Sequence, residues 1–234
     1  MDVLVVVAHP DDADVFCGGT IAKHAERGDE VSIVHMTRGE YGGLRTDSQE
    51  AVGRVREQEA RASGAVLGAS EVAFLEFKDG RITYSLENRV EMVDVIREYD
   101  PDIILTHYKD DLHPDHRATS RLVTDAYYMA SLPLVETDFE PCDPDNIYYF
   151  GKPTSEFTPS MFIDIDGYLE QKVTAIKKHE SQVEFLVEHG GIDAEFDNLI
   201  DGLRAENLVF GKQAGARSAE GFVPLHESAQ EFLG

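Results

Sequence analysis

Residues 3–7, with the sequence VLVVV, form a short apolar run that stops abruptly at polar residues. The run is rich in β-branched side chains and does not alternate, which is typical of a strand buried on both faces in the centre of a parallel sheet. Residues 9–12, HPDD, follow almost directly. Open α/β sheets bind their ligands at the carboxyl ends of their strands. The pattern therefore predicts functional side chains at residues 9–12.

Alternating strand and helix patterns continue along most of the chain. Further strands are predicted at 31–37, 72–77, 102–106, 148–150 and 161–165. Helices are predicted from 17–20 to 28, and at 49–67, 86–96, 114–130 and 169–187, whereas the pattern beyond residue 205 is too weak to assign an element. The first strand, helix and strand span about 35 residues, which requires a right-handed crossover between parallel strands. We therefore expect one α/β domain over residues 1–234, a Rossmann-like three-layer sandwich with a mostly parallel sheet.

Composition narrows the possible partners and the compartment. The chain has 234 residues, of which 42% are hydrophobic, enough for one domain with a full core. The formal charge of −24 argues against nucleic acid or an anionic membrane as a partner, because both repel negative charge. No apolar stretch approaches the ~20 residues of a membrane span and no signal peptide is apparent, so we expect a cytoplasmic protein. Cys17 and Cys142 are too few for a disulfide framework and are expected to be buried free thiols.

A second polar cluster follows the predicted strand at 102–106. Residues 107–116, HYKDDLHPDH, bring together histidines and aspartates. Parallel strands place their carboxyl ends at one edge of the sheet, so this cluster and residues 9–12 should meet. A catalytic zinc ion typically has three protein nitrogen or oxygen ligands and one open position. His9, Asp12 and His116 could supply these ligands.

The other polar residues of the two clusters suggest a division of roles. Asp11 is adjacent to Asp12, so one carboxylate can bind the metal while Asp11 accepts a proton from water as a general base. His113 shares a helical face with His116 and could stabilise an oxyanion or protonate a leaving amine. Asp115 could bind the ring N–H of one histidine and fix its tautomer. Either cluster alone would be read as a helix cap or a turn, but the pair favours a metal site.

Three further features bear on the site and its surroundings. Residues 38–45, RGEYGGLR, are predicted to form a loop at the same edge of the sheet, with Glu40 as a candidate substrate contact. Gly18 and Gly19 lack the G-x-G-x-x-G spacing of a dinucleotide-binding turn, so close packing of a helix on the sheet explains them better. His35 lies in a predicted strand and is expected to be partly buried with its hydrogen bonds satisfied.

The motifs resemble one known family. AHPDDAD at 8–14, together with HPDH at 113–116, resembles the PIG-L/LmbE-like zinc-dependent N-acetylglucosaminyl deacetylases, which include enzymes of bacillithiol and mycothiol biosynthesis. TRGEYG at 37–42, REQEARASGAVLG at 56–68 and KVTAIKKHESQ at 172–182 are similar to further segments of that family. The resemblance therefore covers most of the chain.

By this resemblance, the zinc ligands are His9, Asp12 and His116, the general base is Asp11, and His113 is the electrophilic or acid partner. These roles agree with those suggested by the residues themselves.

The resemblance also assigns a sugar contact to Arg56, whose guanidinium can form paired hydrogen bonds with oxygen atoms. An ion pair with Glu59, one turn along the same predicted helix, is the alternative for this residue, and it stays open.

The chain departs from the family pattern at two places. Many family members have a glutamate directly after the two aspartates. This chain has Ala13 at that position, followed by Asp14. In GARSAEGF at 215–222, Ser218 occupies the position of a family tyrosine, so a substrate contact attributed to that tyrosine does not transfer here.

The expected activity is metal-dependent hydrolysis of the N-acetyl group from an N-acetylglucosamine-containing small molecule, with zinc, or Fe²⁺ or another divalent ion, as the cofactor. The resemblance also implies a homo-oligomer, either a trimer or a hexamer. Two alternatives remain open, namely an amidase acting on another amide conjugate and a noncatalytic metal-binding interaction protein. The noncatalytic protein would need neither Asp11 nor His113.

Overall fold

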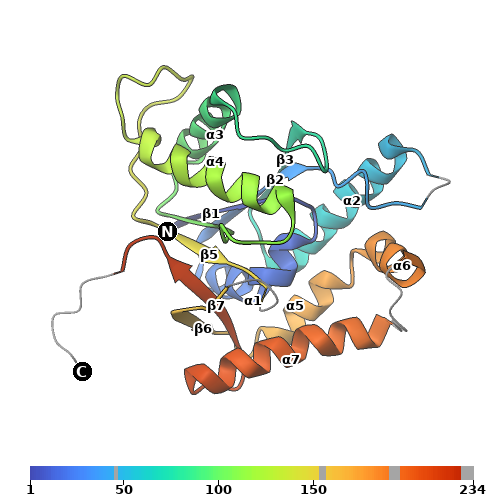
Figure 1. Ribbon diagram of the computed structural model, residues 1–234. Coiled ribbons are helices and arrows are strands. Elements are labelled where there is room, and N and C mark those ends of the chain that lie inside the picture. Colours follow the sequence, from blue (N-terminus) through green and yellow to red (C-terminus); the bar gives the residue numbers. More distant parts are fainter. Residues whose placement is uncertain (45–46, 153–156, 190–195, 228–234) are drawn as a thin grey trace.

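Strands and helices alternate along the chain in the computed structural model, which describes residues 1–44, 47–152, 157–189 and 196–227 (Figure 1). The strands are β1 (Asp2–Val7), β2 (Glu30–Thr37), β3 (Glu71–Phe77), β4 (Ile103–His107), β5 (Asn146–Phe150), β6 (Met161–Asp164) and β7 (Ala219–Pro224). The helices are α1 (Asp12–Arg27), α2 (Gln49–Leu67), α3 (Leu86–Tyr99), α4 (Pro114–Ala130), α5 (Leu169–Ile176), α6 (Glu180–His189) and α7 (Phe196–Ala214).

The order of strands in the sheet changes direction at β1. Among the described residues, seven strands are arranged β3-β2-β1-β4-β5-β7-β6, with β1 to β5 parallel to one another and β7 antiparallel to both β5 and β6. The chain moves outward from β1 to β3 and then returns to the opposite side of β1 with β4. Ligands bind at such a switch point in open α/β sheets. The residues that follow β1 and β4 therefore lie together at the carboxyl edge.

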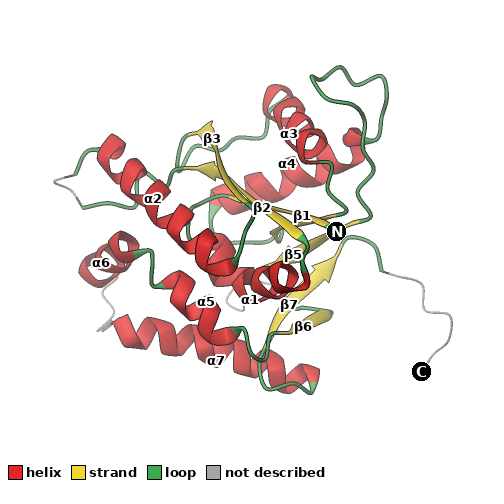
Figure 2. Ribbon diagram, turned by 180° about the vertical axis from the view of Figure 1, so that it is seen from behind, coloured by secondary structure: helices red, strands yellow, loops and turns green. Residues whose placement is uncertain are grey.

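Both faces of the sheet are covered by helices (Figure 2). Leu4 and Val6 of β1 face a core shared with α3 and α4, whereas Val3, Val5 and Val7 face a core shared with α1, α2 and α5. β1 is thus buried on both sides, and the predicted three-layer α/β fold with a mostly parallel sheet is confirmed. Within the residues described, no helix combines the length and the apolarity needed to cross a bilayer.

Helix α1 begins earlier than predicted and contains a break. It starts at Asp12, and Cys17 has non-helical backbone angles (φ −140°, ψ 19°) that separate a short first part from the longer second part. The helix start predicted between residues 17 and 20 thus matches the start of the second part of α1, after Cys17. Asp12 and Asp14 add negative charge to the first turn, which favours a helix N-terminus there.

The single long helix predicted over 169–187 is wrong, because the chain breaks between α5 and α6. His179 Nε2 lies 3.0 Å from a carboxylate oxygen of Asp14. Glu59 accepts hydrogen bonds from the backbone N–H and the hydroxyl of Ser181, at 2.8 and 2.7 Å. These contacts with α1 and α2 hold the junction and satisfy an N–H at the start of α6, so a break replaces the continuous turn.

Neither α7 nor β7 was predicted. The apolar residues of α7 are divided between two small clusters, since Phe210 packs with Phe157 and Ala219 while Ile200 packs with Val173 and Ile176. A helix that buries two separate patches has no single apolar stripe in its sequence.

His35 is buried, as a strand residue can be, but its predicted hydrogen bonds are missing. Neither ring nitrogen has a partner among the described residues, and the ring lies edge-on against Phe74. Burial lowers the pKa of His35 to about 3, so the imidazole is neutral. Cys17 and Cys142 are buried and free, as predicted.

The surface segment between α4 and β5 is organised by one buried cation, Arg97 of α3. Its guanidinium donates hydrogen bonds to the hydroxyl of Thr137 and to four carbonyl groups in that segment, those of Ala130, Leu132, Val135 and Phe139. Arg97 is only 5% exposed, so no water can replace these donors easily.

We predict that Arg97→Met lowers the free energy of unfolding by about 2–4 kcal/mol, because the carbonyl groups lose their charged donor. Urea unfolding of wild type and variant would measure the loss. Arg54→Met is the control, since Arg54 is exposed on α2 and forms a loose 3.8 Å ion pair with Glu50. Equal stability of the two variants would contradict the organising role of Arg97.

Candidate metal centre

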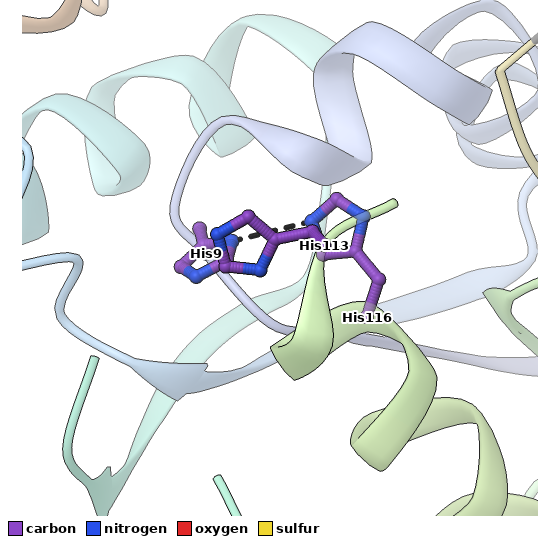
Figure 3. Close-up of side chains that lie close together, drawn as sticks. All are labelled: His9, His113 and His116. Atoms are coloured by element: carbon purple, nitrogen blue, oxygen red, sulfur yellow. Dashed lines mark hydrogen bonds between the residues drawn. The ribbon is translucent and has the colours of Figure 1, made fainter. Parts of the chain in front are cut away.

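The two polar clusters predicted from the sequence meet at the switch point between β1 and β4. His9 follows β1, and Asp12 opens α1. His113 is the N-cap of α4, and Pro114 occupies its first turn, where a missing N–H costs nothing. His116 lies one turn into the same helix. Figure 3 shows the rings of His9, His113 and His116 gathered together, one from the loop after β1 and two from the start of α4.

Two histidine nitrogens and the two carboxylate oxygens of Asp12 lie close together. His9 Nδ1 is 3.3 Å from His116 Nε2 and 3.3 Å from Asp12 Oδ2, and His116 Nε2 is 3.3 Å from Asp12 Oδ1. At zinc–ligand bond lengths of about 2.0–2.1 Å, the ligands of a tetrahedral ion lie about 3.3 Å apart. His9, Asp12 and His116 thus lie at the spacing of a metal site, with a different oxygen of Asp12 facing each histidine, and all three residues are buried. Their role as ligands stays a prediction.

Carboxylates lie behind both ligand histidines. His9 Nε2 lies 3.3 Å from Asp79 Oδ1 and 3.4 Å from Asp115 Oδ2, while His116 Nδ1 lies 3.2 Å from Asp111 Oδ1. A carboxylate beside one ring nitrogen retains the proton there and leaves the lone pair of the other nitrogen for a metal. The backbone N–H of His9 also donates to Asp12 at 2.7 Å. These neighbours would orient the three predicted ligands toward a metal.

His107 is close to the same centre but is not suited to be a ligand. Its Nε2 lies 3.3 Å from Asp12, and a grouping of Asp12, His107 and His116 is geometrically possible. However, Nε2 of His107 accepts a hydrogen bond from the backbone N–H of Ala8 at 3.0 Å, so its lone pair is occupied. The ring stacks on that of His116 with 4.0 Å between centroids. His107 therefore supports a ligand rather than serving as one.

The charge distribution favours a cation at this place. Burial lowers the pKa of His116, but the neighbouring Asp12 and Asp111 outweigh that effect and raise the pKa to about 9. Burial likewise opposes ionisation of Asp12, yet its pKa falls well below the usual range because of His116 and His107. A cluster that attracts protons this strongly also attracts a divalent cation.

Asp11 points to a different partner from Asp12. Arg56 donates from one terminal nitrogen to Asp11 Oδ1 at 2.7 Å and from the other to the carbonyl of Gly39 at 2.8 Å. Burial alone would raise the pKa of Asp11, but the guanidinium lowers it, so Asp11 is an anion at neutral pH. Glu59 bonds to Ser181 instead of Arg56. The alternative ion pair of Arg56 with Glu59 is therefore not formed.

The polar loop predicted over residues 38–45 lies beside Arg56, although Arg45 falls outside the described residues. Gly39 has a positive φ of 63°, and a Cβ atom there would come within 2.4 Å of the Arg56 guanidinium. Glycine is needed for this close approach. Glu40 Oε1 accepts from the backbone N–H of Asp79 at 3.3 Å, and Asp79 accepts from that of Tyr41 at 2.9 Å. The loop is thus tied to the carboxylate that faces His9.

His113 and Asp115 share the start of α4. The backbone N–H of Asp115 donates to His113 Nδ1 at 3.2 Å, which favours the tautomer of His113 with its proton on Nε2. The ring of His113 is 4.6 Å from that of His9. Asp115 is buried, faces His9 and accepts from the backbone N–H groups of Gly80 and Ile82. Asp115 Oδ2 lies 3.4 Å from His9 Nε2, and a role of Asp115 in fixing the tautomer of that ring stays a prediction.

The two departures from the family pattern lie outside the ligand set. Asp14 is buried behind the centre, where it contacts His179 and accepts a hydrogen bond from Ser63. Ser218 donates to Asp166 at 2.9 Å, near β6, and not to a residue of the metal centre.

Asp79, Asp111 and His107 have contacts that the sequence did not reveal. Asp111 and His107 are visible in the 107–116 cluster, but their spacing gave no reason to assign roles to them. Asp79 resembles an ordinary turn residue, because it stands next to Gly80. Only the packing of the 79–82 segment against α4 and the 38–45 loop shows its position beside His9.

Residues 4–127 match the model of one protein family, PIG-L, described as GlcNAc-PI de-N-acetylase. The chain belongs to the PIG-L family. It is 33% identical to a diacetylchitobiose deacetylase of Thermococcus kodakarensis, over 95% of this chain and 83% of that protein. The N,N'-diacetylchitobiose deacetylase structure from Pyrococcus horikoshii superposes with a TM-score of 0.84 at 27% identity, covering 95% of this chain and 83% of the other.

Similarity within this set of relatives extends to a different reaction. The 4-oxalmesaconate hydratase of Pseudomonas putida is 30% identical over 74% of this chain and 71% of that protein. Membership of the PIG-L family is therefore compatible with more than one reaction.

We predict that Asp111→Asn weakens zinc binding by about 10- to 100-fold, because the amide no longer holds the proton on His116 Nδ1 as a carboxylate does. Competition with a chromophoric chelator would measure the dissociation constant. Asp110→Asn is the matched control, since Asp110 has 45% of its side chain accessible and pairs with Lys109 rather than with a predicted ligand. Similar zinc affinities of the two variants would show that Asp111 does not orient His116.

Proposed function

We propose that this protein is a zinc-dependent N-deacetylase that hydrolyses the N-acetyl group of an N-acetylglucosamine-containing small molecule. The arrangement of His9, Asp12 and His116 at zinc spacing, with the anionic Asp11 beside them, carries the proposal. Names of the relatives support the substrate class, because they include deacetylases of diacetylchitobiose, of an N-acetylglucosaminyl inositol and of an N-acetylglucosaminyl malate. Fe²⁺ or another divalent ion could occupy the same ligands.

Zinc held by these ligands would act as a Lewis acid and lower the pKa of water toward ~7. Asp11 then accepts a proton from the water that attacks the acetamide carbonyl carbon. It is partly exposed, with 27% of its side chain accessible, so its second oxygen can face the substrate. Arg56 fixes the position of that carboxylate and keeps it ionised. Both terminal nitrogens of Arg56 already donate hydrogen bonds, to Asp11 and to the carbonyl of Gly39. A contact of Arg56 with the sugar would therefore be shared with Asp11.

His113 completes the reaction on the other side of the amide. With Nδ1 engaged by the Asp115 backbone, its Nε2–H can donate a hydrogen bond to the carbonyl oxygen as negative charge develops there. The carbon–nitrogen bond then breaks, the proton that Asp11 accepted from water passes to the amine nitrogen, and acetate and the free amino sugar leave. Glu40, whose carboxylate accepts from the backbone N–H of Asp79, is proposed to bind a sugar hydroxyl group.

The function is tested with zinc-loaded protein and a panel of amides. The panel contains diacetylchitobiose, the N-acetylglucosaminyl inositol and malate conjugates, and simple acetamides without a sugar. We expect acetate release from at least one sugar conjugate and none after chelation. Hydration of 4-oxalmesaconate without acetate release would favour the hydratase reaction instead. Turnover of the simple acetamides alone would favour the general amidase. No turnover of any compound would favour the noncatalytic binding protein.

We predict that Asp11→Asn lowers kcat by about 10²- to 10⁴-fold while zinc stays bound, because the amide retains the contact with Arg56 but cannot accept the proton. Steady-state kinetics and metal analysis of the same sample would measure both quantities. Loss of the metal together with activity would assign Asp11 to the ligand set. Unchanged kcat would remove Asp11 as the base.

A cytoplasmic location and a homo-oligomeric state, trimer or hexamer, remain predictions from the sequence. Two buried free thiols are compatible with a reducing compartment. Light scattering of the purified protein would measure its molecular mass.

A further inference from the structure

The break in α1 separates the ligand-bearing part of the helix from the rest. The part before Cys17 carries Asp12, and its Phe16 packs edge-on against the rings of His107 and His116. Asp14 anchors the same part to His179. The direction of this short part therefore determines where the Asp12 carboxylate lies relative to both ligand histidines.

A carboxylate from the far end of the sequence occupies the break. Glu220 of β7 accepts hydrogen bonds from the backbone N–H groups of Gly19 and Thr20, at 2.9 and 2.7 Å, one with each oxygen. The second part of α1 starts here, so these N–H groups belong to a helix N-terminus without partners inside the helix. A negative charge at that point is stabilised by the helix dipole. Glu220 thus caps a helix to which it does not belong.

The cap is itself held by a buried cation. Lys172 of α5 donates to Glu220 Oε1 at 2.6 Å, and each of these two side chains is 1% exposed. The two glycines make room for this arrangement. A Cβ atom at Gly19 would come within 2.8 Å of Ile165, and one at Gly18 within 3.2 Å of the Lys172 side chain. Gly18 and Gly19 thus allow close packing, but against α5 and Ile165 rather than on the sheet as predicted.

We propose that Glu220, held by Lys172, is a positioning residue that fixes the break in α1 and so aims Asp12 at the metal. A purely structural ion pair could lie anywhere in the core, and replacing such a pair by apolar residues is often harmless. This pair instead satisfies the N–H groups at the break that lies five residues after a metal ligand. The inference rests on the proposed metal role of Asp12, but it does not depend on which amide is cleaved.

The test compares zinc affinity with stability in three variants. Glu220→Asp keeps a charge beside Lys172 but is one methylene too short to reach both N–H groups. The double variant Lys172→Met/Glu220→Gln removes both buried charges, so that no unpaired ion destabilises the fold, and leaves a single neutral acceptor. Arg97→Met is the control, because it weakens the protein on the opposite face of the sheet, away from the break.

We expect both Glu220 variants to bind zinc about 10- to 100-fold more weakly than wild type, and Arg97→Met to bind it normally despite its lower stability. Chelator competition with Zn²⁺ alone gives the affinity, circular dichroism checks folding, and urea unfolding gives stability. Affinity within twofold of wild type in whichever Glu220 variant folds would overturn the proposal. Equal weakening in Arg97→Met would also overturn it, by showing that any loss of stability has this effect.

Because zinc affinity is measured without substrate, absence of deacetylase activity in the wild type would reject the proposed function and leave this result intact. Conversely, normal zinc affinity in the Glu220 variants of an active deacetylase would reject only the positioning role.

Discussion

The parallel pairing of β1 with β4 is the constraint on which the metal centre depends. The register joins Val3 to Ile103 and continues to Val6 opposite Thr106, so the two strands end at nearly the same level. This places the loop that carries His9 beside the helix that carries His116, although about one hundred residues separate them. A slip of one residue in this pairing would turn each side chain of β4 to the opposite face of the sheet, so a different set of side chains would face each core. The apolar faces of both strands therefore fix the position of the polar atoms beyond their ends.

Around that junction, the protein gathers more negative charge than a metal ligand set needs. Asp79, Asp111 and Asp115 all face ligand histidines without being ligands themselves. Burying carboxylates is costly unless each finds a cation or hydrogen-bond donors. Backbone N–H groups supply some of the donors, as they do for Asp115. The imidazoles then bind either protons or a metal, so metal binding and protonation compete for the same nitrogen atoms.

The sequence allowed the fold class to be predicted and a ligand set to be proposed, because both depend on short-range patterns. The uninterrupted apolar run of β1 indicates a buried strand, and HPDD and HPDH each place their polar residues within a few positions of a strand end or helix start. Asp79 could not be assigned, because its contact with His9 depends on how a turn packs. The break at Cys17 was equally hidden, since the residue that stabilises it, Glu220, lies 201 positions after Gly19. Residues whose roles arise from contacts this distant in sequence have no local signal.

The position of β7 in the sheet has a consequence for how the protein is made. β7 lies between β5 and β6, yet its residues leave the ribosome after every other strand and helix described here. During synthesis, β6 has no neighbour that joins it to the rest of the sheet until β7 is inserted. The histidines and aspartates of the first 116 residues are therefore translated well before Glu220, the carboxylate that caps the break in α1. If Glu220 positions Asp12 as proposed, the centre can take its final shape only after the last strand has been translated.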